Sequence, residues 1–266
     1  MVDGPVNIDA YSPAEIAARV EQAGVSKVHL PILQTLVLGV LAGAFIAFGA
    51  VFYTFVITDT GLGFGLTRLI GGIAFSLGLI LVVVGGAELF TGNNLIVMGW
   101  ADGQISFRQL LRNWFWVYVG NFIGAIAIAG LVALSGVMEA GGGSVAKTAA
   151  SIAEAKIAIP SIEAFIRGVL CNVLVCLAVW LCFAAHTVSG KILAIIFPIS
   201  AFVALGFEHS VANMYLLPAG YFAGATSVTL DGFIANLIPV TLGNIFGGGV
   251  LVALVYWIVY LRKPEQ

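Results

Sequence analysis

"GFEHSVAN", residues 206–213, places an acid and an imidazole side by side in a long apolar stretch. Apart from Glu208 and His209, no ionisable residue with an acidic, basic or imidazole side chain occurs from Ile192 to Leu230. An ionisable group inside such a stretch is costly and marks a functional pathway in membrane proteins. The stretch therefore predicts a polar site within the membrane, centred on Glu208 and His209.

The composition indicates an integral membrane protein. Of the 266 residues, 61% are hydrophobic and only 9% are charged, whereas soluble domains carry about 25% charged residues. No basic patch is large enough for a nucleic-acid partner. Cys171, Cys176 and Cys182 fit no zinc spacing, so neither a metal nor a cofactor is expected. We expect no enzyme, because the sequence brings no nucleophile and base together, and the segment before the first apolar stretch holds no signal-peptide core.

The chain is long enough for six membrane-spanning helices of about 20 residues each. The predicted spans lie within 30–58, 69–87, 113–138, 168–185, 192–207 and 232–261. Two further apolar stretches, 89–101 and 213–222, are too short to span, and each follows soon after a glutamate. We therefore expect the second and fifth helices to be broken inside the membrane. Non-helical backbone at that depth must be buried in protein or line a cavity.

Positive charges suggest the orientation of the chain. Seven Lys and Arg residues flank the spans on the side of the N-terminus, and four flank them on the other side. This bias favours a plasma (inner) membrane protein with both termini in the cytoplasm. "SPAE" (12–15) has the pattern of a capping box and predicts a short amphipathic helix that stops at Gly24. That helix would serve either as an interfacial anchor or as a gate.

An internal repeat divides the chain. Three pairs of segments match in the same order and at nearly constant separation: "GAELFTGNN" (86–94) with "GFEHSVANM" (206–214), "GNFIGA" (120–125) with "GNIFGG" (243–248), and "GVL" (39–41) with "GVL" (168–170). The predicted units are a cytoplasmic segment 1–29, a first repeat 30–138, an outer loop 139–158, a second repeat 159–262 and a cytoplasmic tail 263–266. Each repeat holds three spans, an odd number, so the repeats have opposite orientations in the membrane.

Inverted repeats place their site near the membrane midplane, where the interrupted helices meet. His209 is the main candidate to meet a passing anion, as a hydrogen-bond donor or a proton source. By symmetry Thr91, in the first break, should face it. Glutamates and asparagines recur in both breaks, and we expect them to hold backbone N–H groups that the breaks free rather than to touch substrate. They are Glu88, Glu208, Asn93 and Asn213. Glycines of the third and sixth spans are expected to serve helix packing.

Large apolar side chains near the breaks have two interpretations. They are Phe75, Leu79, Leu89, Phe90 and Phe202. They either pack the core or form constrictions that stop hydrated ions and admit a small or neutralised solute. Lys156 likewise either raises the anion concentration at the outer mouth or is an ordinary exposed lysine.

Several segments together resemble the formate/nitrite transporter family, and its formate channel branch most. They are "GGIAFSLGLILVVVGGAELFTGN" (71–93), "RNWFWVYVGNFIGA" (112–125), "CNVLVCLAVW" (171–180), "GFEHSVANMY" (206–215) and "NLIPVTLGNIFGGG" (236–249). The resemblance implies an all-α, aquaporin-like protomer with helices 2 and 5 broken, assembled in the lipid bilayer as a homopentamer with one pore per subunit. It implies passage of small monovalent anions of weak acids, formate above all and nitrite as a further substrate.

The resemblance also assigns residues to the pathway. It implies that His209 is the central histidine and Thr91 the threonine of the first break, that Phe75 and Phe202 form an outer constriction, and that Leu79, Leu89 and Phe90 form an inner one. It makes Lys156 the vestibule lysine and Asn172 the asparagine of the fourth helix. The chain departs from the family at Gly92, where formate channels usually have a small hydroxyl residue, and after Lys156, where histidines often follow.

Other functions stay open from the sequence. A channel of the same fold for nitrite or hydrosulfide has the same pore-lining residue types. A proton-coupled active transporter would use His209 equally well. A neutral-solute pore of aquaporin type is disfavoured, because the chain has no paired Asn-Pro-Ala motifs.

Overall fold

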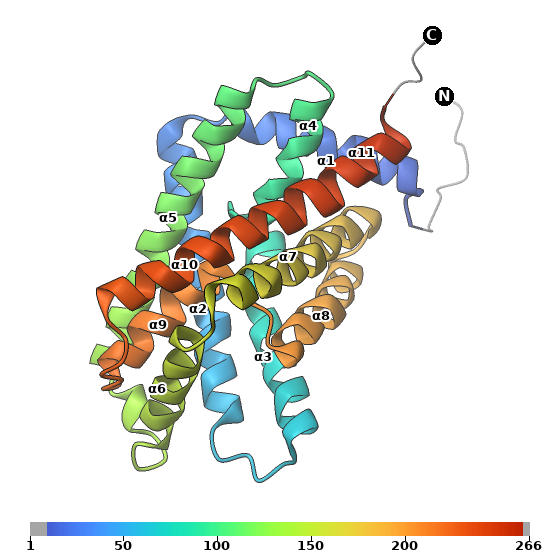
Figure 1. Ribbon diagram of the computed structural model, residues 1–266. Helices are drawn as coiled ribbons and strands as arrows, with labels where there is room; N and C mark the ends of the chain where they lie inside the picture. The colour runs from blue at the N-terminus through green and yellow to red at the C-terminus, as the bar shows by residue number, and fades with distance from the viewer. Residues whose placement is uncertain (1–9, 263–266) are drawn as a thin grey trace.

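The computed structural model describes residues 10–262, and these residues form a bundle of helices (Figure 1). Six helices are long and apolar enough to cross a membrane, as predicted. They are α2 (Ile32–Ile57), α3 (Phe64–Gly85), α5 (Phe107–Leu134), α7 (Ser161–Ala184), α8 (Val188–Leu205) and a last helix made of α10 (Leu230–Ile245), a π-helical stretch (Phe246–Leu254) and α11 (Val255–Tyr260). Residues 1–9 and 263–266, which include the predicted tail, lie outside the described part.

Both predicted helix breaks are present. Helix α3 ends at Gly85, and the chain resumes as a 3-10 turn, η1 (Gly92–Ile96), followed by α4 (Val97–Ala101). Helix α8 ends at Leu205 and resumes as α9 (Ser210–Phe222). The residues that cap α3 and α8 are Gly86 and Gly206, with φ of 81° and 74°. Glycine takes this left-handed conformation without a Cβ penalty, so it terminates each helix sharply.

Several helices begin before the predicted spans. Helix α5 begins at Phe107 rather than near 113, and α7 begins at Ser161 rather than near 168. The early turns of these helices carry charged residues such as Arg108 and Glu163. A charge ends an apolar stretch, but it does not end a helix whose first turns project beyond the hydrocarbon core.

The predicted outer loop, 139–158, is mostly helix, which corrects that prediction. Its glycines are confined to the start, and α6 (Ser144–Ile157) follows them. Helix α1 (Pro13–Val28) precedes α2 in the first repeat as α6 precedes α7 in the second. Lys27 of α1 and Lys156 of α6 correspond in the repeat, because their separation in sequence equals that of Gly39 and Gly168. Figure 1 shows α1 and α11 at one end of the molecule and α6 at the opposite end, as inverted repeats require.

Helix α1 packs against protein along its buried face. The capping box is confirmed, because Ser12 and Glu15 exchange both hydrogen bonds, and the bonds from Ser12 lower the pKa of the Glu15 carboxyl. The predicted stop at Gly24 is wrong, since α1 continues to Val28. A Cβ on Gly24 would lie 3.2 Å from the Cα of Ile96, so this glycine lets α1 contact the restarted helix after the first break.

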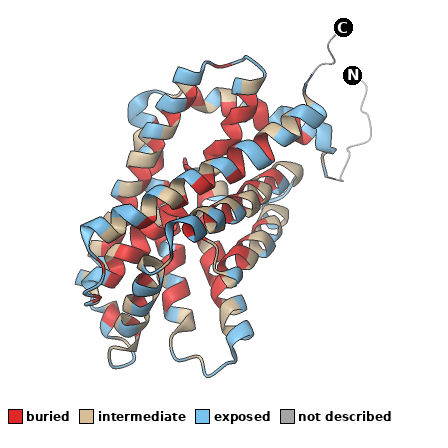
Figure 2. Cartoon of the chain, viewed as in Figure 1, coloured by how far each residue is buried: buried red, intermediate tan, exposed pale blue. Residues whose placement is uncertain are grey.

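The glycines of the spans serve close helix packing, as expected. A Cβ on Gly124 of α5 would collide with the backbone of Val40 in α2, and one on Gly247 would collide with the backbone of Val169 in α7. Figure 2 shows buried residues between the helices, while large apolar residues such as Leu131 are exposed on outward faces. Small residues at helix contacts and apolar residues outside are what a lipid environment favours.

Gly124→Ala should lower the free energy of unfolding by about 1–3 kcal/mol, because the added methyl group must separate α2 from α5. Gly130→Ala on the same helix is the matched control, since a Cβ there meets no atom within 4 Å. The control should be neutral or slightly stabilising, because alanine is the better helix former. Thermal unfolding in detergent measures both, and equal melting temperatures would contradict the packing argument.

Candidate functional site

The two helix breaks meet at Thr91 and His209. The Thr91 hydroxyl oxygen lies 2.9 Å from Nε2 of His209, and both side chains are buried. This contact confirms the prediction that the Thr91 side chain faces His209. Each residue comes from a different repeat, so the polar contact depends on both halves of the fold.

A second hydrogen bond fixes the tautomer of His209. As the N-cap of α9, its Nδ1 accepts a hydrogen bond from the backbone N–H of Ala212 at 3.0 Å. A ring nitrogen that accepts carries no hydrogen, so in the neutral ring the hydrogen is on Nε2. His209 therefore directs an N–H donor at the Thr91 oxygen and at any acceptor that takes its place.

Asn172 and Cys176 hold the backbone of Thr91 from behind. The Asn172 amide shares its two hydrogens among three acceptors, the Asn94 side-chain oxygen and the Asn244 carbonyl at 2.7 Å each and the Thr91 carbonyl at 3.2 Å. The Cys176 thiol donates to the Thr91 carbonyl at 3.4 Å. Asn172 was expected in the substrate pathway. It is fully buried and lines neither of the two cavities described below, so the contacts that it makes are with the first break.

The Glu208 carboxylate binds side chains at the second break. Lys156 Nζ lies 2.7 Å from Oε1, and Asn213 donates to Oε2 at 2.7 Å. Asn213 also donates to Asn236 at 2.8 Å, and Asn236 donates to the Lys156 carbonyl at 2.9 Å. We expected Glu208 and Asn213 to take backbone N–H groups freed by the break. That expectation is wrong, because the Glu208 carboxylate neutralises a lysine instead.

The first break carries the same cluster. Lys27 Nζ lies 2.9 Å from Oε1 of Glu88, and Asn93 donates to Oε2 of Glu88 at 2.7 Å. Asn93 donates to Asn113 at 3.0 Å, and Asn113 donates to the Lys27 carbonyl at 3.4 Å. Here too the side chains of the glutamate and of Asn93 bind other side chains and not freed backbone N–H groups. The two clusters match across the repeat with one difference, because Lys27 also donates to Oδ1 of Asn93 at 2.9 Å, whereas Oδ1 of Asn213 has no partner in the described part of the chain.

Two further asparagines satisfy the backbone at the breaks. Asn121 accepts the N–H of Phe90 at 2.9 Å and donates to the carbonyls of Glu88 and Gly39 at 2.9 and 2.8 Å. Asn244 accepts the N–H of Ser210 at 2.9 Å and donates to two carbonyls of its own repeat, those of Glu208 and Gly168, at 3.0 and 2.8 Å.

Sequence reasoning missed five of these residues as members of the site. They are Lys27, Asn113, Asn121, Asn236 and Asn244. The signal was present, because "GNFIGA" and "GNIFGG" contain Asn121 and Asn244, and the separation of the two "GVL" segments also pairs Lys27 with Lys156. Asn121 and Asn244 directly follow Gly120 and Gly243, two of the glycines that the sequence analysis assigns to helix packing.

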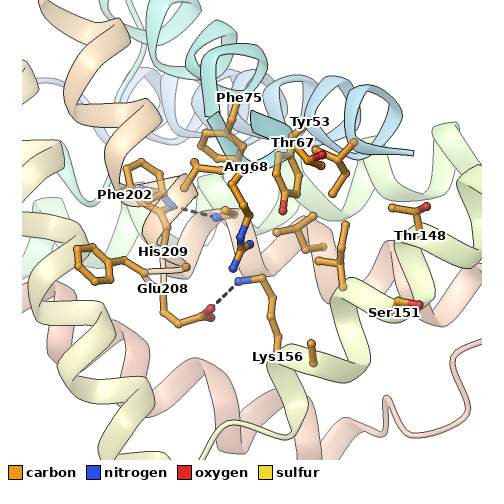
Figure 3. A pocket seen from close by; sticks show the side chains of 18 of the residues that line it. Tyr53, Thr67, Arg68, Phe75, Thr148, Ser151, Lys156, Phe202, Glu208 and His209 are labelled. Carbon is orange, nitrogen blue, oxygen red and sulfur yellow. Dashed lines mark hydrogen bonds and ion pairs between the residues drawn. The ribbon is translucent and has the colours of Figure 1, made fainter. Parts of the chain in front are cut away.

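Two cavities approach the Thr91–His209 pair from opposite ends. The α6-side cavity has about 560 Å³, and its lining includes Lys156, Glu208 and His209 (Figure 3). The α1-side cavity has about 400 Å³, and its lining includes Lys27 and Glu88. Each cavity thus contains one of the two lysine–glutamate pairs.

The predicted constriction residues divide between the cavities, with one exception. Phe75 and Phe202 line the α6-side cavity with ring centroids 5.6 Å apart. Leu79 and Leu89 line the α1-side cavity. Phe90 lines neither, because its ring packs on aromatic side chains of α5, 4.8 Å from Tyr118 and 6.0 Å from Trp114. Its place in an inner constriction stays a prediction.

The fold and the paired polar clusters define a membrane transport protein built from an inverted repeat. Residues 14–258 match the family model described as formate/nitrite transporter, and the chain belongs to this family of multi-pass membrane proteins.

Relatives and solved structures agree with this family. The chain is 43% identical to the formate channel FocA of Escherichia coli over 97% of both chains, and 46% identical to the uncharacterized transporter YrhG of Bacillus subtilis over 96% of this chain and 95% of that protein. Its fold matches a pentameric formate channel with formate bound at a TM-score of 0.81 and 40% identity, covering 87% of this chain and 98% of that chain.

Asn244→Leu should lower the free energy of unfolding by at least about 2 kcal/mol. The substitution keeps a similar volume but leaves the Ser210 N–H and the Glu208 carbonyl without this partner, at about 1–3 kcal/mol each, while the Gly168 carbonyl keeps its place in helix α7. Gln104→Leu is the control, because that amide is exposed on the connection between α4 and α5. Thermal unfolding in detergent compares the two, and similar melting temperatures would show that Asn244 does not support the break.

Proposed function

We propose that the protein is a channel for small monovalent anions of weak acids, with formate as the main substrate and one pore in each subunit of a homopentamer. The observation that carries this proposal is the buried Thr91–His209 pair between two cavities that each hold a lysine–glutamate pair. The similar proteins named as formate channels, and the pentameric structure with formate bound, support the substrate and the assembly.

In the proposed orientation, the α1 side faces the cytoplasm and the α6 side faces outward across the plasma (inner) membrane. Lys and Arg residues are more numerous on the α1 side, in keeping with the charge bias of cytoplasmic loops. The α6-side cavity is then the outer vestibule and the α1-side cavity the inner one.

The lysines offer a passing anion a charged hydrogen-bond donor in each vestibule. Lys156 and Lys27 are held by glutamates, so each cluster is close to neutral and binds a passing anion without trapping it. This balance suits conduction, because a site must bind strongly enough to admit an ion and weakly enough to release it. The matching clusters at the two ends allow passage in both directions.

The apolar rings select against hydrated ions. An anion that passes Phe75 and Phe202 loses water, and a bare charge in an apolar setting is very costly. A weak acid escapes this cost by taking up a proton from the vestibule, so formate crosses as formic acid and releases the proton on the far side. The Nε2–H of His209 and the Thr91 hydroxyl offer hydrogen bonds to the two oxygens at the centre. No other covalent bond changes, so the protein acts as a transporter and not as an enzyme.

Formate flux into liposomes that contain the purified protein tests this function. We expect formate to pass faster than nitrite and the flux to rise as pH falls from 7 to 5, because more of the weak acid is then protonated. Nitrite or hydrosulfide preference would keep the site and change the substrate. Because formate crosses together with a proton in this mechanism, a pH gradient should drive its accumulation. Electrogenic formate flux that a pH gradient does not drive would show that the bare anion passes. Passage of water or glycerol without any anion would overturn the proposal.

His209→Asn should leave folding and assembly intact but lower formate flux at every pH, while the rise of flux with falling pH remains because the proton comes from the vestibule. Asparagine is a good N-cap, so its side chain can still accept the N–H of Ala212, while the Nε2–H donor at the centre is lost. Flux at several pH values, with size-exclusion chromatography as the folding control, measures the effect. Flux equal to that of the unmodified protein would remove His209 from the pathway, and a flattened pH profile would show that the ring itself supplies the proton.

A further inference from the structure

Arg68 of α3 extends into the α6-side cavity with its charge uncompensated. Among residues 10–262, its side chain has no ion pair and no hydrogen bond, and its Nε is buried without a partner. Its guanidinium carbon lies 5.4 Å from the centroid of the Phe64 ring. A buried polar group without a partner is rare and costs free energy, which calls for an explanation.

The guanidinium of Arg68 lies where an entering anion would pass. A Cβ on Gly206, at the second break, would lie 3.2 Å from Nη2 of Arg68. Figure 3 shows Arg68 reaching across the cavity toward the ion pair of Lys156 and Glu208. Carbonyl groups at the end of α8 do not hold the Arg68 side chain in this place, because none of them within residues 10–262 accepts a hydrogen bond from it.

The charges around the α6-side cavity do not balance. Its lining includes four cationic and two acidic residues: Arg68, Lys147, Lys156 and Arg167, with Asp59 and Glu208. Glu208 pairs with Lys156, and Arg167 pairs with Glu163 at 3.1 Å. Arg68 therefore keeps an unpaired charge beside the Lys156–Glu208 pair, whereas the α1-side cavity has only Lys27 facing Glu88.

The excess charge is a departure from the repeat. At the separation in sequence that relates Glu88 to Glu208, the counterpart of Arg68 is Val188, which is exposed. The symmetric part of the fold thus does not require a cation at this position. The α6-side cavity carries a binding group that the α1-side cavity does not have.

The chemistry of the guanidinium indicates which anion fits. Its planar N–H donors match the two oxygens of a carboxylate, whereas an ammonium acts as a point charge. A cavity of about 560 Å³ has room for molecules well above the size of formate. Phe75 and Phe202 line this cavity together with His209, and the Phe202 ring stacks on the His209 ring with centroids 5.9 Å apart.

We propose that Arg68, together with Lys156, forms a carboxylate-binding subsite in the α6-side cavity, ahead of the Phe75–Phe202 pair. The inference rests on the proposed function and adds to it a specific entry site on one side of the membrane. Formate occupies the subsite briefly before it passes the rings. A larger carboxylate such as malonate binds with one carboxylate on Arg68 and the other near Lys156, and it blocks entry because it cannot pass.

Formate flux into membrane vesicles of both orientations, with malonate added outside the vesicles, tests the subsite. Malonate should inhibit when the α6 side faces the added solution and have little effect in the opposite orientation. Arg68→Gln should raise the malonate concentration for half-inhibition about tenfold, the loss expected for one charge-assisted contact. It should also raise the formate concentration for half-maximal flux severalfold, with the maximal flux unchanged.

Two further variants separate a specific contact from net charge. Lys147→Gln removes the same charge from an exposed residue of the same cavity, and it should change both values less than about twofold, as expected for a screened surface charge. Arg68→Lys keeps the charge but not the planar donor set, and it should recover only part of the inhibition. Equal effects of Arg68→Gln and Lys147→Gln, or unchanged inhibition in Arg68→Gln, would overturn the subsite.

A binding measurement keeps the subsite distinct from the proposed function. Malonate should raise the melting temperature of the purified protein and of Lys147→Gln, but not that of Arg68→Gln. An unmodified protein that conducts no formate but is stabilised by malonate through Arg68 would overturn the channel function and keep the carboxylate subsite. Normal formate flux, with no malonate stabilisation of the unmodified protein, would overturn the subsite alone.

Discussion

The fold depends on how two helices can stop and restart inside a membrane. Each break frees backbone N–H and carbonyl groups where lipid offers no hydrogen-bond partner, and each unpaired group costs several kcal/mol. Asn121 and Asn244 supply these partners, one for each break. Both asparagines are buried on the long helices beside the breaks, so each break is tied to a neighbouring helix. The two breaks held in this way place Thr91 and His209 at hydrogen-bond distance.

The lysine–glutamate clusters add a second constraint. A buried carboxylate is tolerated only when it is paired and its remaining oxygen is hydrogen-bonded. Glu88 and Glu208 meet both conditions through a lysine and an asparagine. The lysines come from α1 and α6, so these helices complete the membrane domain and cannot be removed without leaving a buried charge. This explains why α1 follows the protein surface along the first break.

Most of the fold could be predicted from the sequence, because hydropathy and the repeat report directly on burial in lipid. The six spans, both breaks and the meeting of Thr91 with His209 follow from these signals. Helix α6 does not, since its Gly-rich start and mixed polarity resemble a loop, and only its packing stabilises it. The direction of a side chain is also hidden, which is why Phe90 and Asn172, both expected in the pathway, line neither cavity.

The symmetric and asymmetric positions of the repeat have different tasks. The clusters that support the breaks recur in both halves, but the residues at the centre do not. At the separation in sequence that relates Glu88 to Glu208, His209 corresponds to Leu89 and Thr91 to Val211, while Phe202 corresponds to Val82. Duplication thus preserves the hydrogen bonds that make a broken helix stable. Function arises where the two copies differ. A single polar contact between apolar rings needs only one donor and one acceptor. A second pair would widen the polar zone and weaken the selection against hydrated ions.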